Sequence, residues 1–248
     1  MDDPNKQARD DLVASNHILA NESVLDAFGH VSVRHPSRPA HFLLSCSRAP
    51  ELVTADDIFE FDENSELVGS SGATLYIERF IHGEIYRVRP DVHAICHHHA
   101  AAIMPFSIAG VPILPVYQHG AMIGAQVPLW DSRTEYGDTN LLVADPEQGA
   151  SLARALGANW VVLMRHHGAT VVGNTLTELV FRSITACRNA ELQLAALALG
   201  PVQGMSAGEI AKAGRVNPKA MDRALAYWKS RIPARARAPH SQAPTPRS

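Results

Sequence analysis

The sequence has few cysteines, almost no net charge and no long apolar run, and each absence excludes a class of protein. The three cysteines are odd in number and far apart, so we expect no disulfide framework, and a reducing compartment fits. A formal net charge of -3 gives no general attraction to nucleic acid. No apolar stretch approaches the roughly 20 residues that a membrane-spanning helix requires. The acidic, polar start at 1–4 differs from a secretory signal, so we expect a cytoplasmic protein without a membrane or nucleic-acid partner.

The rest of the composition is that of an ordinary globular chain. Hydrophobic residues make up 46% and charged residues 19%, so a chain of 248 residues can bury a sizeable core without covalent staples. We expect one domain over residues 1–232. Residues 233–248 are rich in proline, arginine and serine, and this composition predicts a disordered tail.

Apolar patterns and capping residues predict helices and strands that alternate along the chain. The expected helices span 5–27 and 74–88. Another starts at Asp145-Pro146 and ends at Gly157, and three more begin after Thr175, Ser206 and Asn217. The expected strands lie at 29–34, 42–44, 58–62, 92–96, 111–116, 160–164 and 169–172. Interleaved elements of this kind indicate a layered, mixed α/β domain.

Histidine is the unusual residue, with thirteen copies of which several are clustered. His97 and His99 lie two residues apart at the end of a predicted strand, and residues with this spacing point to the same face. Two adjacent imidazoles can begin a metal site, whereas His98 should point the other way. His93 lies about 13 Å further along the strand, too far to bind the same ion. The alternative is that this histidine-rich end is ordinary polar surface.

A catalytic metal site with open positions needs a third protein ligand. His167 is the best candidate, because it follows an apolar strand and precedes Gly168, which permits an unusual turn. Three neutral imidazoles would leave positions for water and substrate on zinc, manganese, iron or cobalt. Glu78 and His82 are spaced to share one face of the preceding predicted helix, although a surface pair would have the same spacing.

Five segments together resemble the class II aldolase/adducin family. Glu78 lies twelve residues before Pro90, the interval of the family's catalytic glutamate, and His97 and His99 lie seven and nine residues after that proline, like the family's metal pair. His167 precedes a glycine after an apolar strand, like the family's third metal ligand. The similarity covers roughly residues 8–200. The matching segments are GHVSVR at 29–34, ERFIH at 78–82, RPD at 89–91, HHHA at 97–100 and HG at 167–168.

The resemblance implies a three-layer α/β/α fold with a central mixed or antiparallel sheet. It implies one divalent metal ion per subunit, held by His97, His99 and His167, with Glu78 as the catalytic acid or base. It also implies a homotetramer whose active sites lie at subunit interfaces.

The chain departs from the phosphate-using sugar aldolases of this family where those enzymes bind phosphate. They have an asparagine in place of His30 and two serines in place of Tyr76 and Ile77, so we do not expect a phosphorylated sugar. Ser47 and Arg48 begin a Ser-Arg-Ala-Pro run that resembles the family's decarboxylase branch, which acts on hydroxylated aromatic or pyridine dicarboxylates. The planar guanidinium of Arg48 suits a carboxylate, with a solvated loop charge as the alternative.

We therefore expect a divalent-metal-dependent carbon–carbon lyase, and specifically a decarboxylase of a hydroxylated aromatic or heteroaromatic carboxylic acid. Loss of carbon dioxide would give a metal-stabilised, enolate-like intermediate, to which Glu78 or His30 returns a proton. His119 and Tyr117 are candidate substrate-binding residues from their position alone. The alternatives are an aldolase or epimerase acting on an unphosphorylated substrate, a non-haem iron oxygenase on the same fold, and an adducin-like binding module without catalysis.

Overall fold

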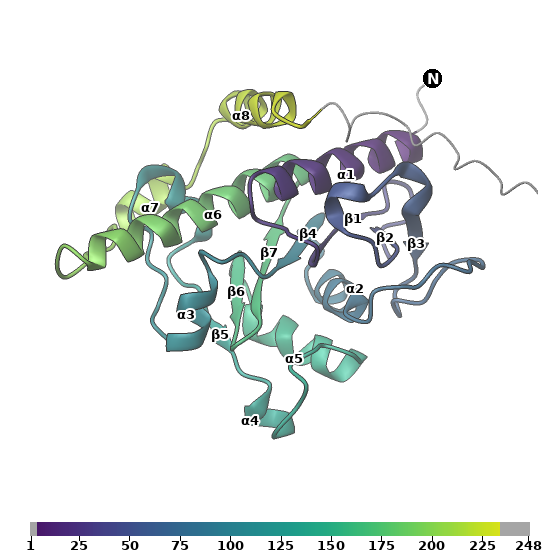
Figure 1. The fold of residues 1–248 in the computed structure, drawn as a ribbon, viewed down its shortest axis with the longest axis horizontal. Coiled ribbons are helices and arrows are strands. Elements are labelled where there is room, and N and C mark those ends of the chain that lie inside the picture. Colours follow the sequence, from purple (N-terminus) through teal and green to yellow (C-terminus); the bar gives the residue numbers. More distant parts are fainter. Residues whose placement is uncertain (1–3, 234–248) are drawn as a thin grey trace, which may run out of the picture.

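The computed structural model describes residues 4–233, so the expected tail, apart from Pro233, lies outside the described residues. A seven-stranded sheet forms the centre of the molecule (Figure 1). The strands are β1 (His30–Arg34), β2 (Phe42–Ser45), β3 (Ile58–Phe61), β4 (Ala94–His98), β5 (Leu129–Trp130), β6 (Val161–Met164) and β7 (Gly168–Gly173). The helices are α1 (Pro4–Asn21), α2 (Arg79–Val88), α3 (Met104–Ala109), α4 (Arg133–Tyr136), α5 (Pro146–Leu156), α6 (Leu176–Leu197), α7 (Ala207–Ala213) and α8 (Pro218–Ser230), with short 3₁₀ helices at Pro50–Leu52, Ala55–Asp57 and Gln118–Ile123.

The strand order is β3-β2-β1-β4-β7-β6-β5. All neighbouring strands are antiparallel except β5 and β6, which run parallel. The predicted mixed, mainly antiparallel sheet is therefore confirmed. β1 and β4 are distant in sequence but adjacent in the sheet, where His30 pairs directly with His97.

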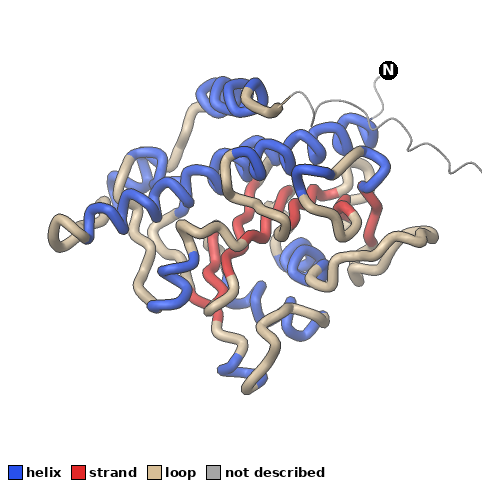
Figure 2. The backbone as a smooth tube through the Cα atoms, viewed as in Figure 1, coloured by secondary structure: helices blue, strands red, loops and turns tan. Residues whose placement is uncertain are grey.

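Two helical layers cover the sheet, one on each face (Figure 2), which confirms the predicted three-layer fold. Helices α1 and α6 pack together on one face, and α2 and α5 pack together on the other. Cys96 joins the core cluster of the α1 and α6 side, whereas Ile95 joins the cluster of the α2 and α5 side. Because side chains alternate along a strand, His97 faces the α2 and α5 layer with Ile95.

Side-chain caps begin four helices where the sequence predicts them, and in α8 the Asn217 side chain accepts from the Lys219 N–H. Asp145 caps α5, Thr175 caps α6 and Ser206 caps α7, each by accepting a hydrogen bond from the N–H three residues further on. The capping box is complete for α7 but not for α6, where the carboxylate of Glu178 pairs with Arg182 instead. In the described part of the chain, no helix combines the length and apolar character needed to cross a membrane.

Two predicted helix boundaries are wrong. The first helix ends at Asn21 rather than at residue 27, and Ser23 beyond it has a φ of 59°, which a right-handed helix does not permit. Helix α2 begins at Arg79 rather than at residue 74. The Ser47 N–H donates to the Thr74 carbonyl at 2.8 Å, and this contact holds the segment before α2 against the neighbouring loop.

The predicted strand at 111–116 is also wrong, because side chains of α6 occupy the backbone groups that a strand would use. The Asn189 amide accepts from the Val116 N–H at 2.9 Å and donates to the Leu114 carbonyl at 2.7 Å. The Gln193 side chain accepts from the Leu114 N–H at 2.8 Å. The segment is therefore bound to a helix through side-chain amides and joins no sheet.

Candidate metal centre

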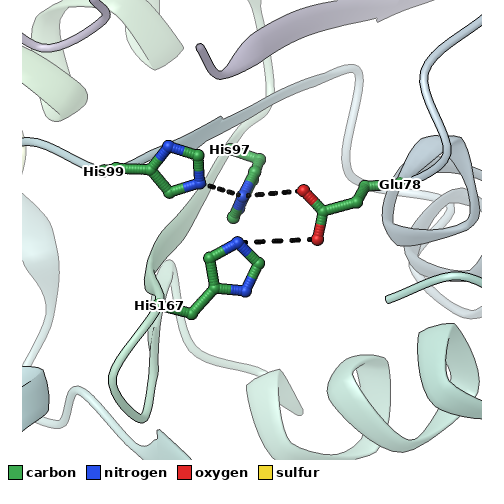
Figure 3. Close-up of side chains that lie close together, drawn as sticks. All are labelled: Glu78, His97, His99 and His167. Carbon is green, nitrogen blue, oxygen red and sulfur yellow. Dashed lines mark hydrogen bonds and ion pairs between the residues drawn. The ribbon is translucent and has the colours of Figure 1, made fainter. Parts of the chain in front are cut away.

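Three histidines and one glutamate from separate parts of the chain converge on one point (Figure 3). His97 lies near the end of β4 and His99 directly follows that strand, while His167 comes from the turn between β6 and β7 and Glu78 from the residue before α2. His97 Nε2 lies 3.0 Å from His99 Nε2 and 3.5 Å from Glu78 Oε2. His167 Nε2 lies 3.6 Å from Glu78 Oε1. One ligand atom from each of the four residues lies within 4.8 Å of every other.

The turn between β6 and β7 brings His167 to β4. Gly168 pairs with Met164 across this hairpin, and His166 before it has a φ of 57°. A Cβ on Gly168 would lie 2.2 Å from the His98 carbonyl oxygen, so the two backbones approach closely only because this residue is glycine. The close approach sets His167 beside the end of β4.

Burial sets the charge state of the cluster. His97 is fully buried, and burial lowers its pKa well below the ordinary value, helped by the neighbouring imidazole of His167. Burial also lowers the pKa of His99 and of His167. Burial raises the pKa of Glu78, and the neighbouring His167 opposes this effect. At neutral pH the three imidazoles are therefore uncharged, the form that binds metal ions.

The spacing of the four residues fits a single divalent ion. Four ligands placed tetrahedrally at about 2.0–2.1 Å from an ion lie about 3.4 Å apart. His97 Nε2 and His99 Nε2 lie 3.0 Å apart, close to that value, and one ligand atom from each of the four residues lies within 4.8 Å of the others. His97 directs Nε2 into the cluster while its Nδ1 lies 3.3 Å from the Thr170 hydroxyl, which fixes the ring from behind. The Val143 N–H likewise orients Glu78 by donating to Oε1 at 3.1 Å.

His30 borders the cluster without belonging to it. Its ring centroid lies 5.1 Å from that of His97 and 4.5 Å from that of Tyr76. Its Nδ1 lies 2.6 Å from His82 Nε2. The prediction that Glu78 and His82 lie on one face of the same helix is wrong for Glu78, which precedes α2, whereas His82 lies on α2 and contacts His30.

The other predicted substrate-binding residues lie outside the cluster. The Arg48 guanidinium donates to the Leu52 carbonyl at 2.7 Å and lies 3.4 Å from Asp57, while Ser47 is exposed. The Tyr76 hydroxyl donates to the Arg48 carbonyl, which joins this loop to the ring that packs on His30.

Tyr117 and His119 contact α6. The Tyr117 hydroxyl donates to the Thr185 carbonyl at 3.4 Å, and the His119 ring meets the Phe181 ring edge-on at 5.6 Å. Neither belongs to the group of four converging residues.

The fold and the four converging residues define a class of protein. The sequence matches the family described as Class II Aldolase and Adducin N-terminal domain over residues 10–194. The chain belongs to this family.

Three relatives illustrate its range. Decarboxylase tropJ of Talaromyces stipitatus is 37% identical over 201 residues, which cover 76% of this chain and 76% of that protein. A 3,4-dihydroxyphthalate decarboxylase of Arthrobacter keyseri is 27% identical and covers 78% of this chain and 80% of that protein. The solved structure of an L-fuculose 1-phosphate aldolase from Glaciozyma antarctica is 25% identical, with a TM-score of 0.76 over 92% of this chain and 89% of that one.

Proposed function

We propose that the protein is a divalent-metal-dependent decarboxylase of a hydroxylated aromatic or heteroaromatic carboxylic acid. The observation that carries this proposal is the convergence of three uncharged imidazoles and one carboxylate within 4.8 Å. Two relatives named as decarboxylases, one at 37% identity and one named for 3,4-dihydroxyphthalate, support the reaction and the substrate class.

His97, His99 and His167 would hold the ion, and the carboxyl group of Glu78 lies beside them without being needed as a ligand. A bound divalent cation supplies positive charge close to the electron pair that remains when the carbon–carbon bond breaks. The substrate hydroxyl and neighbouring carboxylate give this site an oxygen-rich ligand of the kind that such ions prefer.

Glu78 is the best candidate for the proton transfer. Decarboxylation breaks the bond between the ring carbon and the carboxylate, releases carbon dioxide and leaves the electron pair on carbon. A proton must then reach that carbon. The raised pKa of the buried Glu78 carboxyl favours the protonated form that can donate it, and the Val143 N–H holds the group toward the cluster. His30, beside His97, is the second candidate.

An unphosphorylated substrate is supported by Tyr76 and Ile77, which take the place of two phosphate-binding hydroxyls in the sugar aldolases of the family. The Tyr76 hydroxyl is already bonded to the Arg48 carbonyl, so it does not replace those hydroxyls. Arg48 would bind a substrate carboxylate only after releasing Leu52 and Asp57.

Assembly into a homotetramer with active sites at subunit interfaces stays a prediction. It is supported by apolar side chains at the end of α6, where four leucines are 37% to 92% exposed: Leu192, Leu194, Leu197 and Leu199. Exposed apolar groups of this kind favour contact with another subunit. Analytical ultracentrifugation of the purified protein measures the mass of the assembly. The mass of a single subunit at the concentration of the activity assay would contradict the tetramer.

The test of the reaction is carbon dioxide release by protein loaded in turn with zinc, manganese, cobalt and iron. The substrates are hydroxybenzoates, hydroxyphthalates and hydroxylated pyridine carboxylates. We expect carbon dioxide release from at least one dicarboxylate. In Glu78→Gln the rate of release should fall by about 10²–10⁴-fold. Aldehyde release in place of carbon dioxide would favour an aldolase, and oxygen consumption with iron would favour an oxygenase. Either result would contradict the proposal.

A further inference from the structure

A buried hydrogen-bond network of four side chains extends from the candidate metal centre toward the C-terminal end of α2. His30 and Ser32 are two apart on β1 and point to the same face of the sheet. His82 and Tyr86 are four apart on α2 and point back at that face. None of the four is more than 4% exposed.

The contacts alternate between strand and helix. His30 Nδ1 lies 2.6 Å from His82 Nε2, and His82 Nδ1 lies 2.6 Å from the Ser32 hydroxyl. The Ser32 hydroxyl lies 2.8 Å from the Tyr86 hydroxyl. At the Tyr86 end of this network, the Arg34 guanidinium lies 4.7 Å from the centre of the Tyr86 ring.

The last member of this network, Tyr86, determines the direction of its hydrogen bonds. In the described part of the protein, the Tyr86 hydroxyl has Ser32 as its hydrogen-bond partner and no other. If Tyr86 donates to Ser32, Ser32 can donate to His82 Nδ1, and every hydroxyl proton has an acceptor. If the hydrogen bonds run in the opposite direction, the Tyr86 hydroxyl proton is buried without an acceptor, and this arrangement costs more free energy.

This direction fixes both imidazoles. Burial lowers the pKa of His82 to about 3, so this ring is uncharged and carries one proton. With Nδ1 accepting from Ser32, that proton lies on Nε2 and is donated to His30 Nδ1. His30 then carries its own proton on Nε2, the nitrogen on the side of the ring away from α2.

We propose that His30 is a fixed, uncharged hydrogen-bond donor to a carboxylate oxygen of the substrate, and that His82 is the positioning residue that holds it in this tautomer. His30 pairs with the metal-ligand candidate His97 across β1 and β4, and its Nδ1 is committed to His82. Among the described residues, no hydrogen-bond partner occupies Nε2 of His30, so this N–H is available to a ligand beside the cluster. The inference rests on the proposed function and divides the work there: His30 binds, and Glu78 moves the proton.

The tautomer can be measured directly by ¹⁵N–¹H NMR of histidine-labelled, zinc-loaded protein, with the His30 signals assigned by their loss in His30→Gln. We expect a proton on Nε2 of His30 in the wild type. His82→Gln places an amide N–H where Nε2 was and should keep that tautomer, whereas His82→Phe removes the partner and should give a mixture. Tyr136→Phe, which removes a hydroxyl bonded to the Glu147 carbonyl, is the control and should change nothing.

The binding role is tested with phthalate, titrated by calorimetry into the same zinc-loaded proteins. His30→Ala should weaken phthalate binding by about 10- to 100-fold, the usual worth of a hydrogen bond to a charged group. His82→Phe should also weaken binding, but by nothing further in the His30→Ala background, because His82 acts through His30.

Three results would overturn the inference: a proton on Nδ1 of wild-type His30, an unchanged tautomer in His82→Phe, or phthalate affinity that His30→Ala leaves unaltered. None of these measurements needs turnover. A protein that shows the expected tautomer and phthalate binding but releases no carbon dioxide would refute decarboxylation and leave this assignment standing.

Discussion

Replacing Glu78 with glutamine should stabilise the metal-free protein and reduce the further stabilisation that bound metal provides. The Glu78 side chain is 10% exposed, and burial raises its pKa above the ordinary value of 4.5. Because the pKa of Glu78 is higher in the folded state than in the unfolded state, the folded protein keeps the proton to a higher pH. The metal-free protein should therefore lose stability as the pH rises from 4.5 through the raised pKa. Glutamine removes this pH dependence.

The size of the effect follows from the partners of the carboxylate. Among the described residues, the Val143 N–H at 3.1 Å is the hydrogen-bond donor to Glu78, and glutamine keeps the oxygen that accepts it. An under-paired buried polar group costs about 1–3 kcal/mol. At about 2–4 °C per kcal/mol for a chain of this length, metal-free Glu78→Gln should melt about 2–12 °C above the wild type at pH 8.

Thermal melts followed by circular dichroism, with chelator or with saturating zinc, measure both effects. In chelator, the advantage of the variant should shrink as the pH falls toward 4.5. In zinc, the stabilisation by metal should be smaller for the variant, because the carboxylate offsets the charge of the ion. Glu63→Gln, at an exposed turn, is the control. A metal-free Glu78→Gln protein that melts below the wild type at pH 8 would refute the reasoning.

Three further perturbations test the frame around the site. Gly168→Ala would place a Cβ 2.2 Å from the backbone oxygen of His98, so it should displace His167 and weaken zinc binding by about 10- to 100-fold in a competition titration; unchanged affinity would refute this role of the turn. Thr175→Ala removes the cap of α6 and should cost about 1 kcal/mol, or about 2–4 °C in the melting temperature; no change would exclude the cap as a source of stability. Burial lowers the pKa of the three ligand histidines, so zinc affinity should hold as the pH falls to 6.5 and decline below it; a decline that begins above 6.5 would contradict their burial.

Much of the fold could be predicted from local signals. Asp145 and Ser206 each cap a helix through their own side chain, so their neighbours in sequence are enough to locate the helix start. The sequence places the strand before His97 at 92–96, two residues early at both ends compared with Ala94–His98, but its alternation holds.

The errors arose where distant residues decide the local structure. The segment 111–116 has the composition of a strand, but Asn189 and Gln193, more than seventy residues away, bind its backbone. The start of α2 depends on Ser47 in the same way. Local propensity contains no information about such partners.

The candidate site divides along the same line. The spacing of His97, His99 and His167 was enough to propose a metal site, because a strand face and a glycine turn are local features. The sequence does not predict the hydrogen-bond network of His30. Ser32 has the spacing from His30 that one strand face requires, and His82 has the spacing from Tyr86 that one helix face requires. Nothing in the sequence alone says that these two faces meet.

The central claim is that three imidazoles hold one divalent ion, and metal analysis tests it most directly. Plasma mass spectrometry of the purified protein, before and after dialysis against zinc, should give about one ion per subunit in the wild type and in His93→Gln, whose exposed ring lies on the same stretch of chain. His97→Gln should lose that ion. A wild-type protein without stoichiometric metal after loading, or a His97→Gln variant that retains it, would contradict the account.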